Sequence, residues 1–179
     1  MANHSSGPDR TIGQSHCMHA IAPVRTPDAL VAAIKLFRAY AASLNVDLSY
    51  QDFEAEMEAM PGKYAPPAGE LLLARFANGT PVGCVGLRPI EEDGCCEMKR
   101  LYVAPQARGS GLGERLVAAV LREAERIGYR EVRLDTLPFM TTAIALYGKC
   151  GFEVIEPYYQ SPIVGTTFMR RSLSRSGKE

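Results

Sequence analysis

The chain has 179 residues, of which 46% are hydrophobic and 22% charged, and its 20 Lys+Arg residues balance 20 Asp+Glu. This length suits one domain that buries its own core. Nucleic-acid binders usually carry a basic excess for phosphate contacts, so the zero net charge predicts no nucleic-acid partner. Wholly apolar runs are only a few residues long, as at Leu71–Ala74, so the sequence also predicts no membrane span and no membrane partner.

The two ends of the chain differ in pattern from the rest. Residues 1–15 lack the cationic and apolar parts of a secretory signal, so we expect a disordered leader and a cytoplasmic protein. Residues 175–179 are expected to be a flexible tail. The folded domain is therefore predicted over residues 16–174.

The cysteine pattern argues against disulfides and zinc. Five cysteines form an odd set with one adjacent pair, and no CxxC spacing is present. The segment His16-Cys17-Met18-His19 has no second ligand cluster to complete a metal site. We expect ordinary thiols and no metal.

The first third of the domain predicts one strand and two helices. An apolar run over 16–23 favours a strand. Thr26, with proline next to it, caps a helix that runs to about Asn45. Ser49 with Asp52 three residues later resembles a capping box, which would open the second helix. The acidic residues Glu54, Glu56 and Glu58 are spread around that helix by their period-two spacing, so only Glu54 and Glu58 share a side, and we expect solvated acids rather than a functional cluster.

The remaining elements follow from turn residues and periodicity. Asn78-Gly79 is typical of a hairpin between strands 71–77 and 81–87. Helical spacing predicts helices from Leu112 to Gly128 and over 141–150. Further strands are expected at 95–103, 131–136, 152–155 and 166–170. This order predicts an α/β (α+β) domain with a mixed sheet covered by helices.

A glycine-rich loop enters the helix that begins at Leu112. Glycines allow close approach of a ligand, and the free N–H groups at a helix start attract an anion. Arg108 adds a charged fork suited to phosphate. Glu114 excludes both a P-loop and a dinucleotide fingerprint by its position. A pyrophosphate site over Arg108–Gly113 is therefore favoured, and the alternative is a helix cap without a ligand.

The same segment carries a family resemblance. Arg108-Gly109-Ser110-Gly111-Leu112-Gly113 resembles the acetyl-CoA signature of GNAT acetyltransferases, and residues 98–105 resemble the strand that precedes it. Residues 143–152 resemble the family's Ala-x-x-Leu-Tyr-x-x-x-Gly-Phe helix end. The resemblance implies the GNAT fold, with a mostly antiparallel sheet of about seven strands and about four helices.

The resemblance also implies which residues bind acetyl-CoA. Backbone groups of the strand before the loop would bind the pantetheine arm and the acetyl carbonyl, and those of the loop would bind the pyrophosphate. The strand residues are Leu101, Tyr102 and Val103, and the loop residues are Arg108, Gly109, Ser110, Gly111, Leu112 and Gly113. The family often has Asn where this chain has Met140, which puts one side-chain contact to the cofactor arm in question.

Two residues are candidates for proton transfer. Tyr147 matches the family tyrosine that donates to the departing thiolate, and full transfer from a phenol to a thiolate is uphill by about 2 kcal/mol, so hydrogen bonding is favoured. A core tyrosine is the alternative reading. Strand alternation would put Glu97 on one face with Lys99, Leu101 and Val103, where it is a candidate general base. A surface ion pair of Glu97, or a water chain as base, stays open.

The predicted function is acetyl transfer from acetyl-CoA to a primary amine of a small molecule or peptide. The amine would attack the thioester directly. The alternative is a non-catalytic module that binds acyl-CoA. The sequence identifies neither the acceptor nor the oligomeric state, and a homodimer is compatible with it.

Overall fold

The computed structural model describes residues 19–174. The predicted leader (1–15) and tail (175–179) lie outside this range, as does most of the run before β1. The elements in chain order are β1 (Ala20–Pro23), α1 (Pro27–Ser43), η1 (Ser49–Gln51), α2 (Phe53–Glu58), η2 (Gly62–Tyr64), β2 (Glu70–Arg75), β3 (Pro81–Pro89), β4 (Cys95–Val103), η3 (Pro105–Ala107), α3 (Leu112–Ile127), β5 (Glu131–Thr136), α4 (Thr141–Lys149), β6 (Glu153–Ile155) and β7 (Thr167–Ser172).

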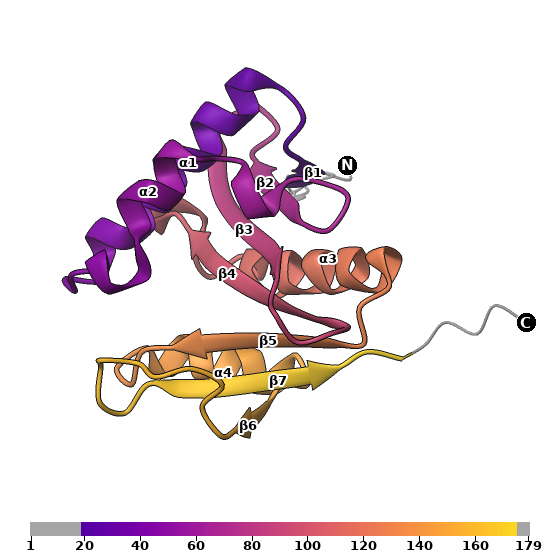
Figure 1. Cartoon of the computed structure of the whole chain (residues 1–179). Helices are drawn as coiled ribbons and strands as arrows, with labels where there is room; N and C mark the ends of the chain where they lie inside the picture. The colour runs from indigo at the N-terminus through magenta and orange to yellow at the C-terminus, as the bar shows by residue number, and fades with distance from the viewer. Residues whose placement is uncertain (1–18, 175–179) are drawn as a thin grey trace, which may run out of the picture.

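All seven strands form one sheet in the order β1-β2-β3-β4-β5-β7-β6. Every neighbouring pair is antiparallel except β4 and β5, which run parallel. The expected mixed, mostly antiparallel sheet with four α-helices is therefore confirmed for the described residues. Figure 1 shows β4 and β5 close together where they begin and far apart where they end.

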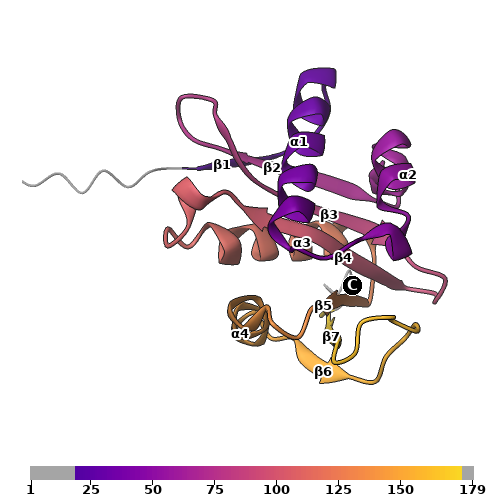
Figure 2. The same ribbon diagram turned by 90° about the vertical axis from the view of Figure 1, so that its left-hand side faces the viewer.

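Helices cover both faces of the sheet and create two cores. On one face the apolar stripe of α3, including Leu116 and Val120, packs against β2 to β5, and Tyr147 of α4 joins this core. On the other face Phe37 of α1 and Phe53 of α2 pack against the strands. Figure 2 shows α1 and α2 above β3 and β4, and α4 beside β6 in the lower part of the view.

Local signals explain most element ends. The Thr26 side chain accepts from the backbone N–H of Ala29 at 3.2 Å, as an N-cap does. Gly128 ends α3 with φ +103°, a left-handed conformation that glycine adopts without a Cβ penalty. The expected elements agree with the structure to within a few residues at each end.

The predicted capping box at the second helix is wrong. Ser49 bonds back to Asp47 instead, through both its N–H (2.8 Å) and its Oγ (2.9 Å). Residues 49–51 form the short η1 turn, and α2 begins only at Phe53. Asp52 precedes it with φ +51° and no side-chain cap. Local bonding of Ser and Asp to nearby backbone competes with the capping geometry.

The parallel contact of β4 with β5 is short. Their register covers only Cys95–Glu97 and Glu131–Arg133, after which the two strands separate. The β4 edge beyond Glu97 therefore has no strand partner on its β5 side. Since backbone N–H and C=O groups need partners, this edge is suited to bind an extended ligand.

We expect Gly86→Ala to destabilise the fold by about 1–3 kcal/mol through overpacking. A Cβ at Gly86 would lie 2.5 Å from Tyr64 Cε1, and the Tyr64 ring is buried. Its hydroxyl is also held by Glu56 at 3.0 Å, so the ring has little room to move. Urea unfolding of the purified variant measures the change.

Gly148→Ala is the matched control. A Cβ at this exposed position of α4 meets no atom within 4 Å, and alanine favours a helix over glycine. This variant should gain about 0.5–1 kcal/mol. Equal effects of the two substitutions would contradict the close contact at Gly86.

Candidate functional site

A β-bulge in β4 precedes the expected ligand edge. Cys84 pairs with Tyr102 and Gly86 pairs with Lys99, so Val85 alone faces two residues, Arg100 and Leu101. Arg100 adopts φ +58°, which is uncommon for a residue with a Cβ. A bulge of this kind re-aims the side chains that follow it.

The bulge overturns the expected strand alternation. Glu97 and Lys99 lie on the α1/α2 face, where Lys99 faces Gly86 and Tyr64. Leu101 and Val103 instead pack against the α3 core on the opposite face. The four residues therefore do not share one face, because strict alternation assumes a regular strand. Tyr102 now points toward α1, where its ring meets that of Tyr40 edge-on at 6.4 Å.

The backbone of Val103 faces the opening between β4 and β5. The N–H of Ala104 donates to Val82 of β3 at 2.9 Å, so the carbonyl of Val103 in the same peptide unit points the other way. This carbonyl accepts from Arg108 Nε at 3.1 Å. Residues two apart direct their backbone groups to the same edge, so Leu101 faces this opening too. Both are placed as a pantetheine-binding edge requires, and that role stays a prediction.

Two glycines of the loop adopt a left-handed backbone conformation. Gly109 and Gly111 adopt φ +77° and +75°, and a Cβ on either would meet only open space. Gly111 precedes α3 without a side-chain cap, so no side chain of the described residues caps the first N–H groups of that helix. Ser110 Oγ donates inward to Ala107 at 2.6 Å. Loop and helix start therefore present backbone donors to solvent.

Leu112 and Gly113, the last two residues of the loop segment, also contribute to packing. Leu112 is 1% exposed, so only its backbone is available to a ligand. Gly113 lies against α4, where a Cβ would come within 3.2 Å of Leu146. Glycine at this place allows α3 and α4 to approach closely, which brings Tyr147 near the loop.

A small cavity lies at the opening between β4 and β5. It holds about 30 Å³ and is lined by both Leu101 and Tyr147, the two residues expected at the thioester. Asp135 and Leu137 line it from β5 and the turn that follows. The structure thus brings together the strand edge and the tyrosine that the sequence placed 46 residues apart.

Tyr147 is buried in this setting. It is 6% exposed, its ring packs on Phe152 at 5.9 Å, and no hydrogen bond joins its hydroxyl to another described residue. Burial raises the pKa of the Tyr147 phenol well above its ordinary value. Full transfer of its proton is therefore less favourable than in water, whereas donation of a hydrogen bond stays available. Met140, at the start of this helix, packs with the α1/α2 core.

A second and larger hollow lies beside the cavity on the α1/α2 face. It measures about 800 Å³ and shares Gln51 and Lys99 with the small cavity. Its walls include Lys63 from η2, the turn between β3 and β4, and the loop between β6 and β7. A small molecule or a side chain of a peptide fits a space of this size.

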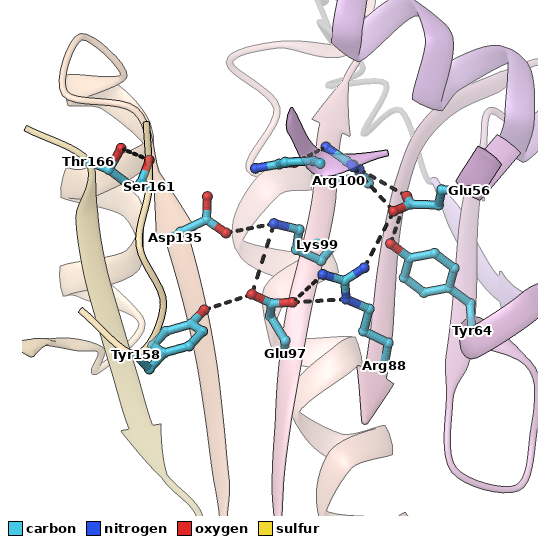
Figure 3. Close-up of polar contacts among 11 residues, drawn as sticks. Glu56, Tyr64, Arg88, Glu97, Lys99, Arg100, Asp135, Tyr158, Ser161 and Thr166 are labelled. Carbon is cyan, nitrogen blue, oxygen red and sulfur yellow. Dashed lines mark hydrogen bonds and ion pairs between the residues drawn. The ribbon is translucent and has the colours of Figure 1, made fainter. Parts of the chain in front are cut away.

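Buried charges connect the two spaces (Figure 3). Glu97 accepts from Arg88 at 2.7 and 2.9 Å and from the Tyr158 hydroxyl at 2.7 Å. Lys99 donates to Asp135 at 2.6 Å and lies 3.9 Å from Glu97. Glu56 of α2 contacts two arginines of the sheet, Arg88 of β3 at 3.4 Å and Arg100 of β4 at 3.1 Å. Three carboxylates and three cationic side chains thus form one network whose formal charges cancel.

Sequence reasoning missed most of this network. Glu56 was expected to be solvated like Glu54 and Glu58, yet its side chain is only 12% exposed, whereas that of Glu54 is 70% exposed. Its period-two spacing does place Glu56 apart from its two neighbours, which is the one signal available. Lys99, Arg100 and Asp135 gave no signal, because their pairing depends on the bulge and on the separation of two strands.

No metal or membrane feature is present in residues 19–174. No group of three His, Cys, Asp or Glu side chains gathers there at metal-binding distance. Within the same range no helix has the length and apolar content needed to cross a bilayer.

The network predicts acid-sensitive stability. Burial opposes ionisation of Asp135, but the charge and hydrogen bond of Lys99 outweigh it and hold the pKa of Asp135 below its ordinary value of 3.8. Likewise burial opposes ionisation of Glu56, and Arg100 lowers its pKa below 4.5. Both carboxylates therefore stabilise the fold above about pH 4.5, and this contribution is lost as the pH falls through their folded-state pKa values.

Asp135→Asn should cost about 3 kcal/mol at pH 7, because Lys99 would stay buried without its counter-charge. The difference from wild type should shrink between pH 5 and pH 3, as measured by urea unfolding at several pH values. Glu58→Gln is the control, since Glu58 is exposed and should change stability by less than about 0.5 kcal/mol. A constant difference for Asp135→Asn across this range would be contrary to the assignment.

Known proteins share both the sequence and the fold of this chain. The acetyltransferase (GNAT) family profile matches residues 32–152. An uncharacterised N-acetyltransferase of Schizosaccharomyces pombe is 40% identical over 156 residues, covering 87% of this chain and 96% of that protein. The crystal structure of a Klebsiella pneumoniae protein named for acyl-CoA N-acyltransferase activity is 30% identical, with a TM-score of 0.67, and the match covers 88% of this chain and 99% of that one.

A third match is more distant. A phosphinothricin acetyltransferase of Sinorhizobium meliloti, crystallised with AcCoA, has a TM-score of 0.64 and 17% identity, over 87% of this chain and 88% of that one. At this identity the likeness concerns the fold alone. The profile match and the identity to the yeast and Klebsiella proteins carry the assignment: this chain is an acetyltransferase of the GNAT family.

Proposed function

We propose that this enzyme transfers the acetyl group of acetyl-CoA to a primary amine of a small molecule or peptide. The observation that carries the proposal is the small cavity lined by both Leu101 and Tyr147. It lies beside the unpaired β4 edge, and that strand leads directly into the glycine loop. One extended ligand can therefore reach all three features.

The loop fits the pyrophosphate of CoA. Gly109 and Gly111 border open space, and the start of α3 offers uncapped N–H groups. Arg108 lies in the same loop, bonded to the Val103 carbonyl, and could turn to a phosphate. The relative crystallised with AcCoA shares the fold and adds support.

The acceptor would enter from the opposite side, through the 800 Å³ hollow. Because Gln51 and Lys99 line both spaces, the amine can approach the small cavity there without crossing the sheet. Donor and acceptor thus meet where β4 and β5 separate.

In the proposed reaction the deprotonated amine forms a C–N bond to the acetyl carbon, and the C–S bond breaks. The chain's part is to orient both molecules, to donate a hydrogen bond from Tyr147 to the leaving sulfur, and to accept the proton of the amine. CoA leaves as the thiol. Burial of Tyr147 favours hydrogen bonding over early proton transfer.

Glu97 remains the proposed base, with Tyr158 as a route for the proton. Both of its oxygens already accept hydrogen bonds, from Arg88 and from Tyr158. The Tyr158 side chain lines the acceptor hollow, so a proton can reach Glu97 through this hydroxyl as well as directly. A water chain is the alternative that the sequence left open.

The location proposed is the cytoplasm. The four cysteines of the described range, at 84, 95, 96 and 150, are all free thiols, which is typical of proteins in a reducing compartment. A homodimer and the absence of nucleic-acid and membrane partners stay predictions from the sequence.

The direct test is release of free thiol from acetyl-CoA in the presence of a panel of primary amines. Amine-dependent release, with the N-acetyl product identified by mass spectrometry, supports the proposal. Tight acetyl-CoA binding without any amine-dependent release would favour the non-catalytic module instead.

Tyr147→Phe should lower kcat by about 10²- to 10⁴-fold, the usual range for a positioned acid. Ring packing on Phe152 is kept, so the affinity for acetyl-CoA and the melting temperature should stay near wild type. The loss belongs to kcat rather than KM, because the bond is made mainly in the transition state. A folded variant with wild-type kcat would assign Tyr147 to packing alone.

Gly111→Glu should abolish CoA binding by placing a carboxylate at the phosphate site. Gly111→Gln is the matched control, since it has the same size and the same strain at φ +75° but no charge. Calorimetry with CoA should show a much larger loss for the Glu variant. Equal losses would mean that shape or strain, rather than charge, disrupts the loop.

A further inference from the structure

We propose that the acceptor is a primary amine that also carries a carboxylate, and that Arg133 and Lys63 bind this carboxylate in the 800 Å³ hollow. The inference rests on the proposed function and names the substrate class for it. It is drawn from the charges that line the hollow and from how far each is already neutralised.

The hollow is lined by four cationic side chains and three acidic ones: Lys63, Arg88, Lys99, Arg133, Glu91, Glu92 and Glu97. The buried members are satisfied from within. Glu97 is held by Arg88, and Lys99 by Asp135. A ligand would therefore find their charges already balanced, and the remaining cations decide what the hollow attracts.

Arg133 has two carboxylate partners, and one of them, Glu92, is exposed enough for a ligand to replace it. In the strand register it stands directly beside Glu97, which stands beside Arg88. Its Nε donates to Glu131 at 2.6 Å, and that side chain is only 14% exposed. Its Nη1 contacts Glu92 at 2.7 Å, and Glu92 is 60% exposed on the turn between β3 and β4.

Glu92 thus marks where an incoming carboxylate can bind. A carboxylate already occupies this side of Arg133, which shows that the geometry accepts one. The Glu92 side chain is 60% exposed, so it can move into water when a ligand carboxylate takes its place on the half-buried Arg133. The guanidinium itself is held in place, because it lies over the Tyr158 ring at 5.4 Å.

Lys63 supplies a second, unused charge. It is exposed on η2, lines the same hollow, and makes no ion pair with any other residue of the 19–174 range. Arg133 and Lys63 come from β5 and η2, so they reach the hollow from different elements. Neither of them lines the thioester cavity, whereas Lys99 and Gln51 do, so an acceptor whose carboxylate binds Arg133 and Lys63 would direct its amine toward Lys99 and Gln51.

A polyamine fits this hollow less well. Its second ammonium would need an acid that is not already paired inside. Glu97 and Asp135 are engaged by Arg88 and Lys99, which leaves only the rim residues Glu91 and Glu92. The same assay that tests the carboxylate decides between these two classes.

The substrate experiment uses pairs that differ only in the carboxylate. Glycine, β-alanine, 4-aminobutanoate and 6-aminohexanoate are each compared with the matching carboxamide, and a diamine such as putrescine is included. We expect at least one acid to exceed its amide in kcat/KM by roughly 10- to 100-fold, as for a charge-assisted contact. Amides or the diamine equal to or better than every acid would overturn the inference.

Variants assign the effect to residues. Arg133→Gln and Lys63→Gln should each raise KM for the preferred acid and leave that of its amide nearly unchanged. Glu92→Gln should lower KM for the acid by roughly 2- to 5-fold, since it removes a competing carboxylate. Arg38→Gln is the control, because Arg38 also pairs with one exposed glutamate, Glu54, but does not line this hollow.

Binding separates this inference from the proposed function. The N-acetylated acids and amides are titrated calorimetrically into the enzyme saturated with CoA, which requires no turnover. If the acids bind in a manner that depends on Lys63 and Arg133 but no amine is acetylated, the carboxylate site stands and the proposed acetyl transfer fails. If amines are acetylated without any preference for a carboxylate, the proposed function stands and this inference fails. Since Lys63 is exposed, its variant should fold normally and keeps the test decisive even if Arg133→Gln is unstable.

Discussion

β4 and β5 run side by side in the centre of the sheet but share hydrogen bonds only over three residues each. Beyond Glu97 and Arg133 they separate, although both stay covered by helices. Backbone groups in such a place require partners, so we propose that the β4 edge at Leu101 and Val103 binds the cofactor, although the Val103 carbonyl accepts from Arg108 in this structure. The small cavity, the acceptor hollow and the approach of Tyr147 all depend on this separation.

A buried ion pair spans the opening. Lys99 reaches from β4 to Asp135 of β5, and both side chains are at most 7% exposed. On the other side of β4, Arg100 is held by Glu56 and lies over the Phe53 ring at 5.0 Å. Buried ion pairs of this kind keep their geometry, because separating the two side chains would leave a buried charge without a counter-charge. These pairs therefore connect β4 to β5 and to α2, and they hold the side chain of Arg100, whose backbone has φ +58°.

In the proposed function the bulge also separates the two substrates. Before it, the side chains of Glu97 and Lys99 point to the α1/α2 face, where the acceptor hollow lies. After it, Leu101 and Val103 turn their side chains to the α3 core and present backbone to the opening. In the proposed function this one strand offers charged side chains to the acceptor and peptide groups to the acetyl donor. In the proposed reaction the two molecules meet at Lys99, which lines both spaces.

The sequence by itself determined the element order, the capped start of α1 and the glycine loop, because these depend on residues close together in the chain. It also determined the family, since the motifs at 108–113 and 143–152 are local. Only the tertiary structure decided which side chains meet at the site. Glu56 was expected to be solvated, yet Arg88 and Arg100 contact it from two strands. For Glu97 the sequence left a base and a surface ion pair open, and the structure shows a buried carboxylate that accepts from Arg88 and Tyr158. A bulge shifts alternation by one residue, and the end of a strand pair leaves no mark in composition, so neither can be read from periodicity.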